Sequence, residues 1–262
     1  MRFLFAGLLL TVFCSATLFA QGLDSEDMEK VNAVVAKALQ KLGGEKYKGV
    51  STLSSSGKLS ILEGNKISSF QSFVDIIVYP DKERTDFAER GSRTVQVNTG
   101  NTGWIYDELF ENFGAQTEKQ LENFKRGRRA HYDFLLRGNW REEAKATYEG
   151  RRVASLGKRN DVVRLTFEDE FWVEYEFSDN GLPSKTVYPS VNSDGVEIKE
   201  ENRYAQFILR GGILFPFIVD HFTDGKHSYR VNYVKVQFNR PVKDSIFVKP
   251  SSPKKIKKLK VK

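Results

Sequence analysis

The sequence has almost no cysteine: the single residue of this type, Cys14, lies in an uncharged, mostly apolar run from Phe3 to Ala20. This run follows a basic start, ends in small residues and gives way to polar sequence at Gln21, which is typical of a secretory signal peptide. We expect residues 1–20 to be cleaved and the mature chain to be periplasmic; an uncleaved membrane anchor is the alternative. Because bulky Phe13 precedes Cys14, we expect no lipidation. A mature chain without cysteine has neither disulfides nor a thiol nucleophile.

The sequence also lacks the common signatures of catalysis. It contains no Gly-x-Ser-x-Gly elbow and no His-Glu-x-x-His run, and only 3 histidines. One cluster, His221, Asp224 and His227, lies in an expected hairpin turn and has no further ligand in view for a metal. His131 is expected on a helix surface. We therefore predict a non-enzymatic protein without catalytic residues, metal site or cofactor.

Outside the C-terminus, the mature chain lacks net charge. The formal charge of +7 falls to zero once Arg2 and the six lysines between residues 254 and 262 are set aside. A neutral body argues against a nucleic-acid surface spread over the fold. Residues 251–262 are Lys-rich with Ser and Pro, and we expect a disordered tail. The tail and the cluster from Arg126 to Arg129 are candidate contacts for an anionic membrane surface or a protein partner, with simple solvation as the alternative.

The chain is long enough and hydrophobic enough to fold. Its 262 residues are 40% hydrophobic, with 20 Phe and 10 Tyr, which is enough for a real core. No linker divides the mature chain, so we predict one domain over residues 21–250. Apolar residues at three- and four-residue steps predict a helix from Leu23 to Leu42, with Asp24 or Ser25 as its cap and Gly43-Gly44 as its end.

After Gly49 the hydrophobic period changes to two, which indicates antiparallel strands joined by short turns. The nearly continuous apolar run Phe73–Tyr79 predicts a strand covered on both faces. A helical segment interrupts the strands from Thr117 to Leu136. Thr117 and Gln120 have the spacing of a capping box, and Gly127 is expected to split the segment into two helices.

Strand patterns resume near Ala144. Two alternating segments, 163–167 and 171–177, place large apolar side chains on one face. A change of register at Tyr233 and Val234 predicts a β-bulge. A curved sheet with an aromatic inner face and helices over that face either packs them as a core or encloses a ligand cavity, and the residues alone leave both open.

Several short motifs, in this order, resemble a known family. They are Ala38–Gly44, Tyr79–Arg84, Gly100–Trp104, Phe215-Pro216 with Asp224–Lys226, and Asn239–Val242 with Phe247–Pro250. The chain is similar to the LolA/LolB-like outer-membrane lipoprotein-sorting proteins over most of its mature length, as a divergent form. It departs from their pattern in having Asn98-Thr99-Gly100 where Asp-Gly is usual, and in its lysine tail.

The resemblance implies a mainly β (α+β) fold: an unclosed antiparallel β-barrel wrapped around the leading helix and an inserted helical lid. It implies a lipid- or lipoprotein-binding protein that shields acyl chains in an apolar concavity, as a periplasmic carrier. An interaction or sensory domain on the same fold, without lipid cargo, is the alternative. The helices around Phe124 and Leu135 and an apolar loop over residues 213–219 are the candidate lids, and Arg84 is expected to hydrogen-bond lid carbonyls. The candidate lipid-binding residues are Val163, Leu165, Phe167, Phe171, Val173, Tyr175, Phe177, Phe124, Leu135, Phe215 and Phe217.

Overall fold

One long antiparallel sheet forms most of the molecule. In the computed structural model, which describes residues 15–64, 66–154, 157–192 and 194–260, 13 strands follow the order β6-β5-β4-β3-β2-β1-β13-β12-β11-β10-β9-β8-β7. The end strands β6 and β7 do not pair with each other, so the barrel is unclosed, as predicted. The strands are β1 (Thr52–Glu63), β2 (Lys66–Val78), β3 (Lys82–Glu89), β4 (Ser92–Thr99), β5 (Thr102–Asp107), β6 (Asn112–Ala115), β7 (Ala144–Val153), β8 (Arg159–Phe167), β9 (Trp172–Phe177), β10 (Pro183–Val191), β11 (Glu197–Arg210), β12 (Ile213–Thr223) and β13 (Lys226–Phe238).

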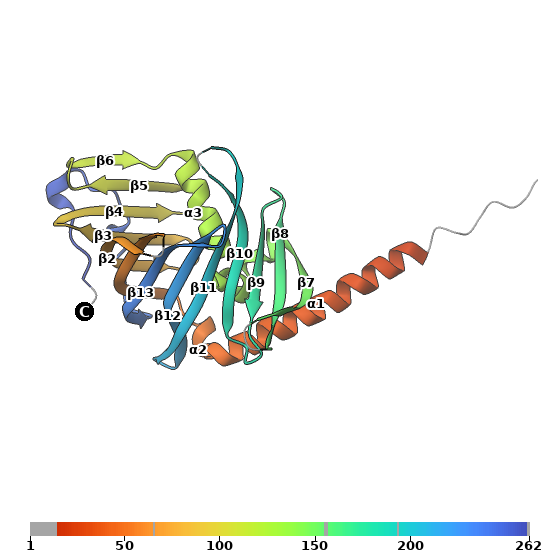
Figure 1. The fold of residues 1–262 in the computed structure, drawn as a ribbon. Coiled ribbons are helices and arrows are strands. Elements are labelled where there is room, and N and C mark those ends of the chain that lie inside the picture. The colour runs from red at the N-terminus through yellow and green to blue at the C-terminus, as the bar shows by residue number, and fades with distance from the viewer. Residues whose placement is uncertain (1–14, 65, 155–156, 193, 261–262) are drawn as a thin grey trace, which may run out of the picture.

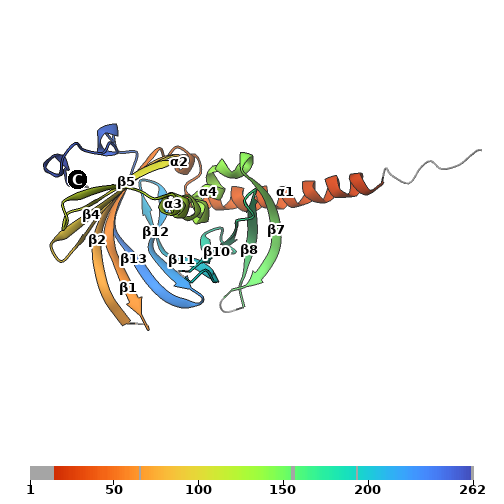
Figure 2. The same ribbon diagram turned by 90° about the horizontal axis from the view of Figure 1, so that it is seen from above.

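The helices that precede and interrupt the strands are α1 (Ser15–Leu42), α2 (Glu45–Lys48), α3 (Glu118–Ala130), α4 (Tyr132–Arg137) and the short η1 (Asn139–Glu142). α3, α4 and the C-terminal part of α1 lie on the inner side of the curved sheet, whereas the N-terminal part of α1 extends beyond the sheet past β7 (Figures 1 and 2). Among the described helices, none combines the length and the apolar character that crossing a membrane requires.

The leading helix ends where the sequence predicts but begins earlier. α1 stops at Leu42, and Gly43 and Gly44 then adopt φ angles of 137° and 58°, which favour glycine. Its first residue is Ser15 and not Leu23, because the helical backbone continues through the expected cap at Asp24 or Ser25. The predicted signal peptide lies largely outside the described residues and stays a prediction.

The inserted helical segment has the predicted capping box. The Thr117 side chain accepts from the backbone N–H of Gln120, and the Gln120 side chain accepts from that of Thr117. The expected split at Gly127 is wrong, because α3 continues through it to Ala130. The break falls at His131, whose extended backbone separates the helices and whose ring caps α4 by accepting from Asp133 N–H at 3.3 Å.

The predicted bulge near Tyr233 and Val234 is confirmed. Ser56 of β1 pairs with Lys235, whereas the next residue, Gly57, pairs with Tyr233, so Val234 is the extra residue of β13. A Cβ atom on Gly57 would lie 2.1 Å from the Asn232 carbonyl oxygen, so only glycine fits at this point.

The largest core cluster lies where α1 and α4 pack against β7–β10. It includes the fully buried Leu42, Leu135, Leu165 and Tyr175. A second cluster lies on the opposite, outer face of the sheet, around Val95, Val97 and Trp104. A third joins β1, β12 and β13 through Leu53, Phe215, Phe217 and Val236. The sheet is therefore covered on both faces over part of its length.

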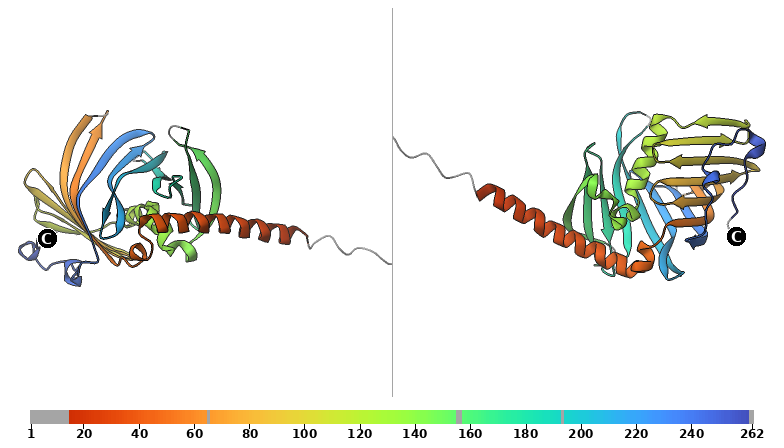
Figure 3. Two further views of the ribbon diagram at one scale, coloured as in Figure 1. Left: turned by 90° about the horizontal axis from the view of Figure 1, so that it is seen from below. Right: turned by 180° about the vertical axis from the view of Figure 1, so that it is seen from behind.

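The outer cluster is covered by the C-terminal segment. Residues 240–260, which we call the strap, run over the outer face beside β3–β6 and include η2 (Asp244–Ile246) and η3 (Pro253–Lys255) (Figure 3). Ile256 and Leu259, spaced by three, pack on the outer cluster, and Arg84 and Asp86 hydrogen-bond the backbone of the same segment. The described part of the tail for which disorder was expected, residues 251–260, is therefore packed on the sheet.

Candidate functional site

A cavity of about 300 Å³ lies between the inserted helices and the inner face of β1–β3, β12 and β13. The sheet is curved, and α3 and α4 span its concave side (Figure 2). The cavity lies beside β2 and β3, between these helices and the sheet. Its apolar wall consists of Leu53, Ile77, Tyr79, Phe124, Phe134, Phe215 and Tyr233. The rings of Phe215 and Tyr233 meet edge to face, with centroids 5.1 Å apart.

One end of the cavity is acidic. Asp75 of β2 and Glu83 of β3 both line it, and the Thr85 hydroxyl donates to the Asp75 carboxylate at 2.8 Å. Burial, followed by the charge of Glu83, raises the pKa of Asp75 well above its ordinary value. Burial also raises the pKa of Glu83, although the Arg128 guanidinium opposes that rise. Neither carboxyl group has an ion-pair partner among the described residues.

A second polar group holds α4 against the sheet. The Asp133 carboxylate accepts hydrogen bonds from the hydroxyls of Tyr47 and Tyr79, and it lies 3.5 Å from the Arg137 guanidinium. Burial alone would raise the pKa of Asp133, but Arg137, His131 and the two hydroxyls outweigh burial and hold it below its usual value. Arg137 also stacks on Tyr79, 3.6 Å from the ring centroid, and donates to the Val50 carbonyl at 2.8 Å.

His131 is at this site and not on an outer helix surface. It lines the cavity where α3 meets α4, and burial lowers the pKa of its imidazole below the ordinary value. The interpretation as a surface residue is wrong because the helix breaks at this residue and turns the ring inward.

Most of the predicted lipid-binding residues belong to the packed core and not to the cavity. Eight of them lie in the cluster filled by α1 and α4, each at most 4% exposed: Val163, Leu165, Phe167, Phe171, Val173, Tyr175, Phe177 and Leu135. The predicted alternation of the β8 and β9 side chains is confirmed, because these residues lie together on the inner face of the sheet. Phe124 and Phe215 do line the cavity, and Phe217 lies beside Phe215 in the third cluster.

Two predicted lid elements have a different structure. The expected loop over residues 213–219 is part of strand β12, paired with β11 and β13. Arg84 lies on the outer face, only 3% exposed, because successive side chains of β3 alternate between faces. Its guanidinium donates to the carbonyls of Ile246 at 3.0 Å and Lys257 at 2.8 Å, both in the strap.

The acidic end of the cavity was missed in the sequence. Its signal was a carboxylate within an apolar run: Asp75 interrupts Phe73–Tyr79, and a charged side chain in a strand covered on both faces needs a partner or a cavity. The contribution of Tyr47 had no local signal, because it meets Asp133 across a separation of 86 residues.

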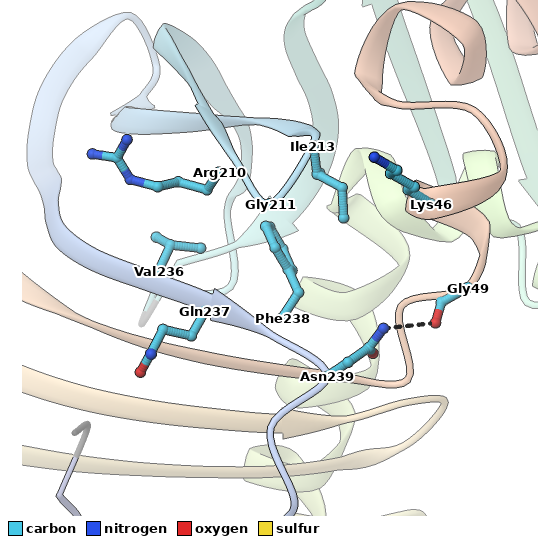
Figure 4. A pocket seen from close by; sticks show the side chains of 9 residues that line it. All are labelled: Lys46, Gly49, Arg210, Gly211, Ile213, Val236, Gln237, Phe238 and Asn239. Atoms are coloured by element: carbon cyan, nitrogen blue, oxygen red, sulfur yellow. Dashed lines mark hydrogen bonds between the residues drawn. The ribbon is translucent and has the colours of Figure 1, made fainter.

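The remaining polar clusters do not form a comparable site. His221 pairs with Glu200 at 2.9 Å and His227 with Asp220 at 2.9 Å, and no group of three or more His, Cys, Asp or Glu in the described residues is arranged to hold a metal. A more open pocket of about 460 Å³ lies between α2 and the β11–β12 turn. Its two basic side chains, Lys46 and Arg210, lie on opposite sides and do not point toward a common position (Figure 4).

Comparisons with known proteins find similarity in the fold and none by sequence. No model of a protein family matches this sequence, and neither does any curated protein. Solved structures do match. Among them, a LolA superfamily protein from Nitrosomonas europaea has 13% identity and a TM-score of 0.57, with coverage of 84% of this chain and 97% of that one. A DUF1329 family protein from Desulfovibrio piger has 12% identity and a TM-score of 0.59, with coverage of 83% and 97%. An outer membrane lipoprotein-sorting protein domain from Vibrio parahaemolyticus has 10% identity and a TM-score of 0.55, with coverage of 83% and 97%.

These identities are low, and each match covers nearly all of the other chain, so the likeness concerns the architecture as a whole. The resemblance seen in the short sequence motifs is confirmed at this level: the protein has the LolA-like fold.

Proposed function

We propose that the protein is an exported, non-enzymatic carrier that binds the acyl part of a lipid or lipoprotein in the cavity between α3, α4 and the inner sheet. The observation that carries this proposal is the pairing of an apolar wall with a polar end in one cavity. An acyl chain against Phe124, Phe215 and Tyr233 leaves water at about 0.8 kcal/mol per methylene. The fold shared with a lipoprotein-sorting domain supports the same class of ligand.

The volume limits the cargo. A cavity of about 300 Å³ is at the lower end of the roughly 300–1,000 Å³ typical of small-ligand sites. It accommodates part of one acyl chain in the present arrangement, and a larger cargo requires α3 to move. α3 suits that role because only Ala130 is buried among its residues, whereas α4 is buried at four of its six residues.

The polar end suits a head group. Asp75 and Glu83 offer protonated or charged oxygens to a hydroxyl or amine of the cargo, and Arg128 lies near enough to oppose the rise in the pKa of Glu83 that burial causes. An amphiphile would then lie with its chain toward Phe215 and its polar group toward β3.

The direct experiment is native mass spectrometry of the protein purified from periplasm without detergent, followed by organic extraction and identification of bound lipid. We expect a stoichiometric acyl species. An apo mass that persists after incubation with lipids and acylated peptides would refute the proposal.

Gly127 provides a variant that separates binding from folding. It lines the cavity from α3, and a Cβ atom added there would meet nothing within 4 Å. Gly127→Leu should reduce lipid occupancy while keeping the melting temperature, because leucine also raises helix propensity. Gly127→Ala is the matched control, with similar helix propensity and little added volume. Equal occupancy in both variants would place the ligand elsewhere.

One observation favours the second candidate, an interaction or sensory domain without cargo. The inner face of β8 and β9, where most of the predicted lipid contacts lie, is already filled by the protein's own helices. Under this candidate, the wild type and the Gly127→Leu variant would both be purified without bound lipid.

A further inference from the structure

The net charge of the protein is concentrated in the strap. Residues 240–260 contain eight basic residues and one acidic residue, Asp244, which gives +7, equal to the charge of the whole chain. The basic residues are Arg240, Lys243, Lys249, Lys254, Lys255, Lys257, Lys258 and Lys260. All seven lysines are exposed, and none has an ion-pair partner in the part of the chain that the structure describes. Asp244 itself pairs with Lys82 of β3.

The backbone of the strap is fixed, so these charges have a defined place. Arg84 donates to two strap carbonyls, and the Leu259 N–H donates to Asp86 at 3.2 Å. Arg84 and Asp86 are themselves a buried ion pair at 2.9 Å. The indole N–H of Trp104 donates to the Phe247 carbonyl at 2.8 Å. The lysines thus project from an attached segment and not from a free tail.

Between the strap and the sheet lies a pocket of about 350 Å³. Every charged side chain that lines it is basic: Arg84, Arg240, Lys243, Lys257, Lys258 and Lys260. Its apolar lining comes from Ile76, Val242, Ile246 and Leu259. A cationic rim over an apolar floor matches an anionic amphiphile, whose phosphate meets the rim and whose adjacent carbon atoms meet the floor.

We propose that the strap docks the protein on an anionic phospholipid bilayer and that this pocket receives a phosphate-bearing head group. The site lies on the outer face of the sheet, opposite the helices, so it is separate from the cavity assigned to cargo (Figure 3).

The chemistry of the strap favours a bilayer over a nucleic acid. Single strands are held by bases stacked on exposed aromatic rings, and the one aromatic residue of the strap, Phe247, is only 5% exposed. Val248 is 65% exposed beside Lys249, which suits the boundary between head groups and acyl chains.

The test is sedimentation with vesicles of phosphatidylcholine alone or mixed with phosphatidylglycerol. The wild-type protein should bind the mixed vesicles, bind less as salt rises, and bind phosphatidylcholine weakly. The triple variant Lys257→Gln, Lys258→Gln, Lys260→Gln should lose at least about tenfold in apparent affinity. All proteins compared share the same N-terminus, so any contribution of residues 1–20 is common to them.

The matched control is Lys66→Gln, Lys199→Gln, Lys226→Gln, which removes the same charge from exposed positions outside the strap. Its affinity for the mixed vesicles should stay within about twofold of the wild type. Equal losses in the two triple variants would overturn the proposal, because net charge alone would then explain binding. So would binding of soluble glycerol phosphate without binding of vesicles. Unchanged melting temperatures show that both variants fold.

Discussion

The hydroxyl of Tyr79, just after β2, donates a hydrogen bond to the carboxylate of Asp133 on α4, across 54 residues of sequence. Tyr47 donates to the other oxygen of the same carboxylate, from the short helix α2 that follows α1. One side chain therefore joins the leading helix region, the sheet and the inserted helices. This junction borders the cavity and holds α4 against the sheet.

Asp133→Asn should destabilise the fold by roughly 3 kcal/mol, because it leaves the Arg137 guanidinium buried without its counter-charge. Urea denaturation at pH 7 measures the loss. The lowered pKa of Asp133 means that its contribution is present above about pH 4 and is lost as the pH falls, so the deficit should shrink in acid. Glu63→Gln, at an exposed site, should change stability by less than about 0.5 kcal/mol. Equal effects would show that the junction is not important for stability.

Asp75→Asn should instead increase the stability of the fold at pH 7. The raised pKa of Asp75 means that the folded state keeps a proton which the unfolded chain releases near pH 4, so the wild type loses stability as the pH rises from there. The amide keeps an oxygen for the Thr85 hydroxyl and removes this loss. Denaturation across pH should therefore show the variant more stable at pH 7, with the two curves converging below about pH 4. A less stable variant at pH 7 would mean that the Asp75 charge is compensated. Asp194→Asn, in an exposed turn, should follow the wild type throughout.

A chain ending at Pro250 should be less stable by about 3 kcal/mol. It loses the packing of Ile256 and Leu259 on the outer cluster, and Arg84 loses its hydrogen bond to the Lys257 carbonyl. Replacing only Lys254 and Lys255 by serine should have little effect, since both side chains are exposed. If truncation leaves the denaturation midpoint unchanged, the segment does not stabilise the fold, and the disordered tail expected from composition would be the better description.

Gly57→Ala should destabilise by about 2 kcal/mol or more, because the new methyl group would overlap the Asn232 carbonyl and the Phe73 ring, 2.9 Å away. Thermal unfolding is the measurement, and Gly114→Ala, where a Cβ atom meets nothing within 4 Å, is the control. Equal melting temperatures would mean that the bulge relaxes without penalty.

Local patterns predicted the architecture well. Alternation in 163–167 and 171–177 identified the inner face, and the shift of register at Tyr233 identified the bulge, because both depend on neighbours in the chain or on one adjacent strand. The capping box depends only on Thr117 and Gln120, which are three positions apart. The break between the helices was predicted at the wrong residue. Gly127 is tolerated within α3, whereas the backbone of His131 is extended and its side chain caps the start of α4.

The cavity was harder to predict because its position depends on long-range packing. Nothing local shows that α1 and α4 fill the space over β8 and β9 and leave a hollow beside β2 and β3. The faces of Asp75 and Arg84 follow from alternation, but which face is inside is decided by the direction in which the sheet curves. The strap was missed because composition does not reveal that two apolar residues among lysines meet an apolar surface.

The attachment of the strap to one face also gives the molecule a large electric dipole, since +7 lies on the outer side and the rest of the chain sums to zero. Near a negatively charged boundary, such a dipole turns a protein by torque before any contact forms. The protein would then arrive with the outer face of β3–β5 leading and the helices trailing. The inserted helices would face the aqueous space, where a second macromolecule has free access to them while the first surface is still occupied.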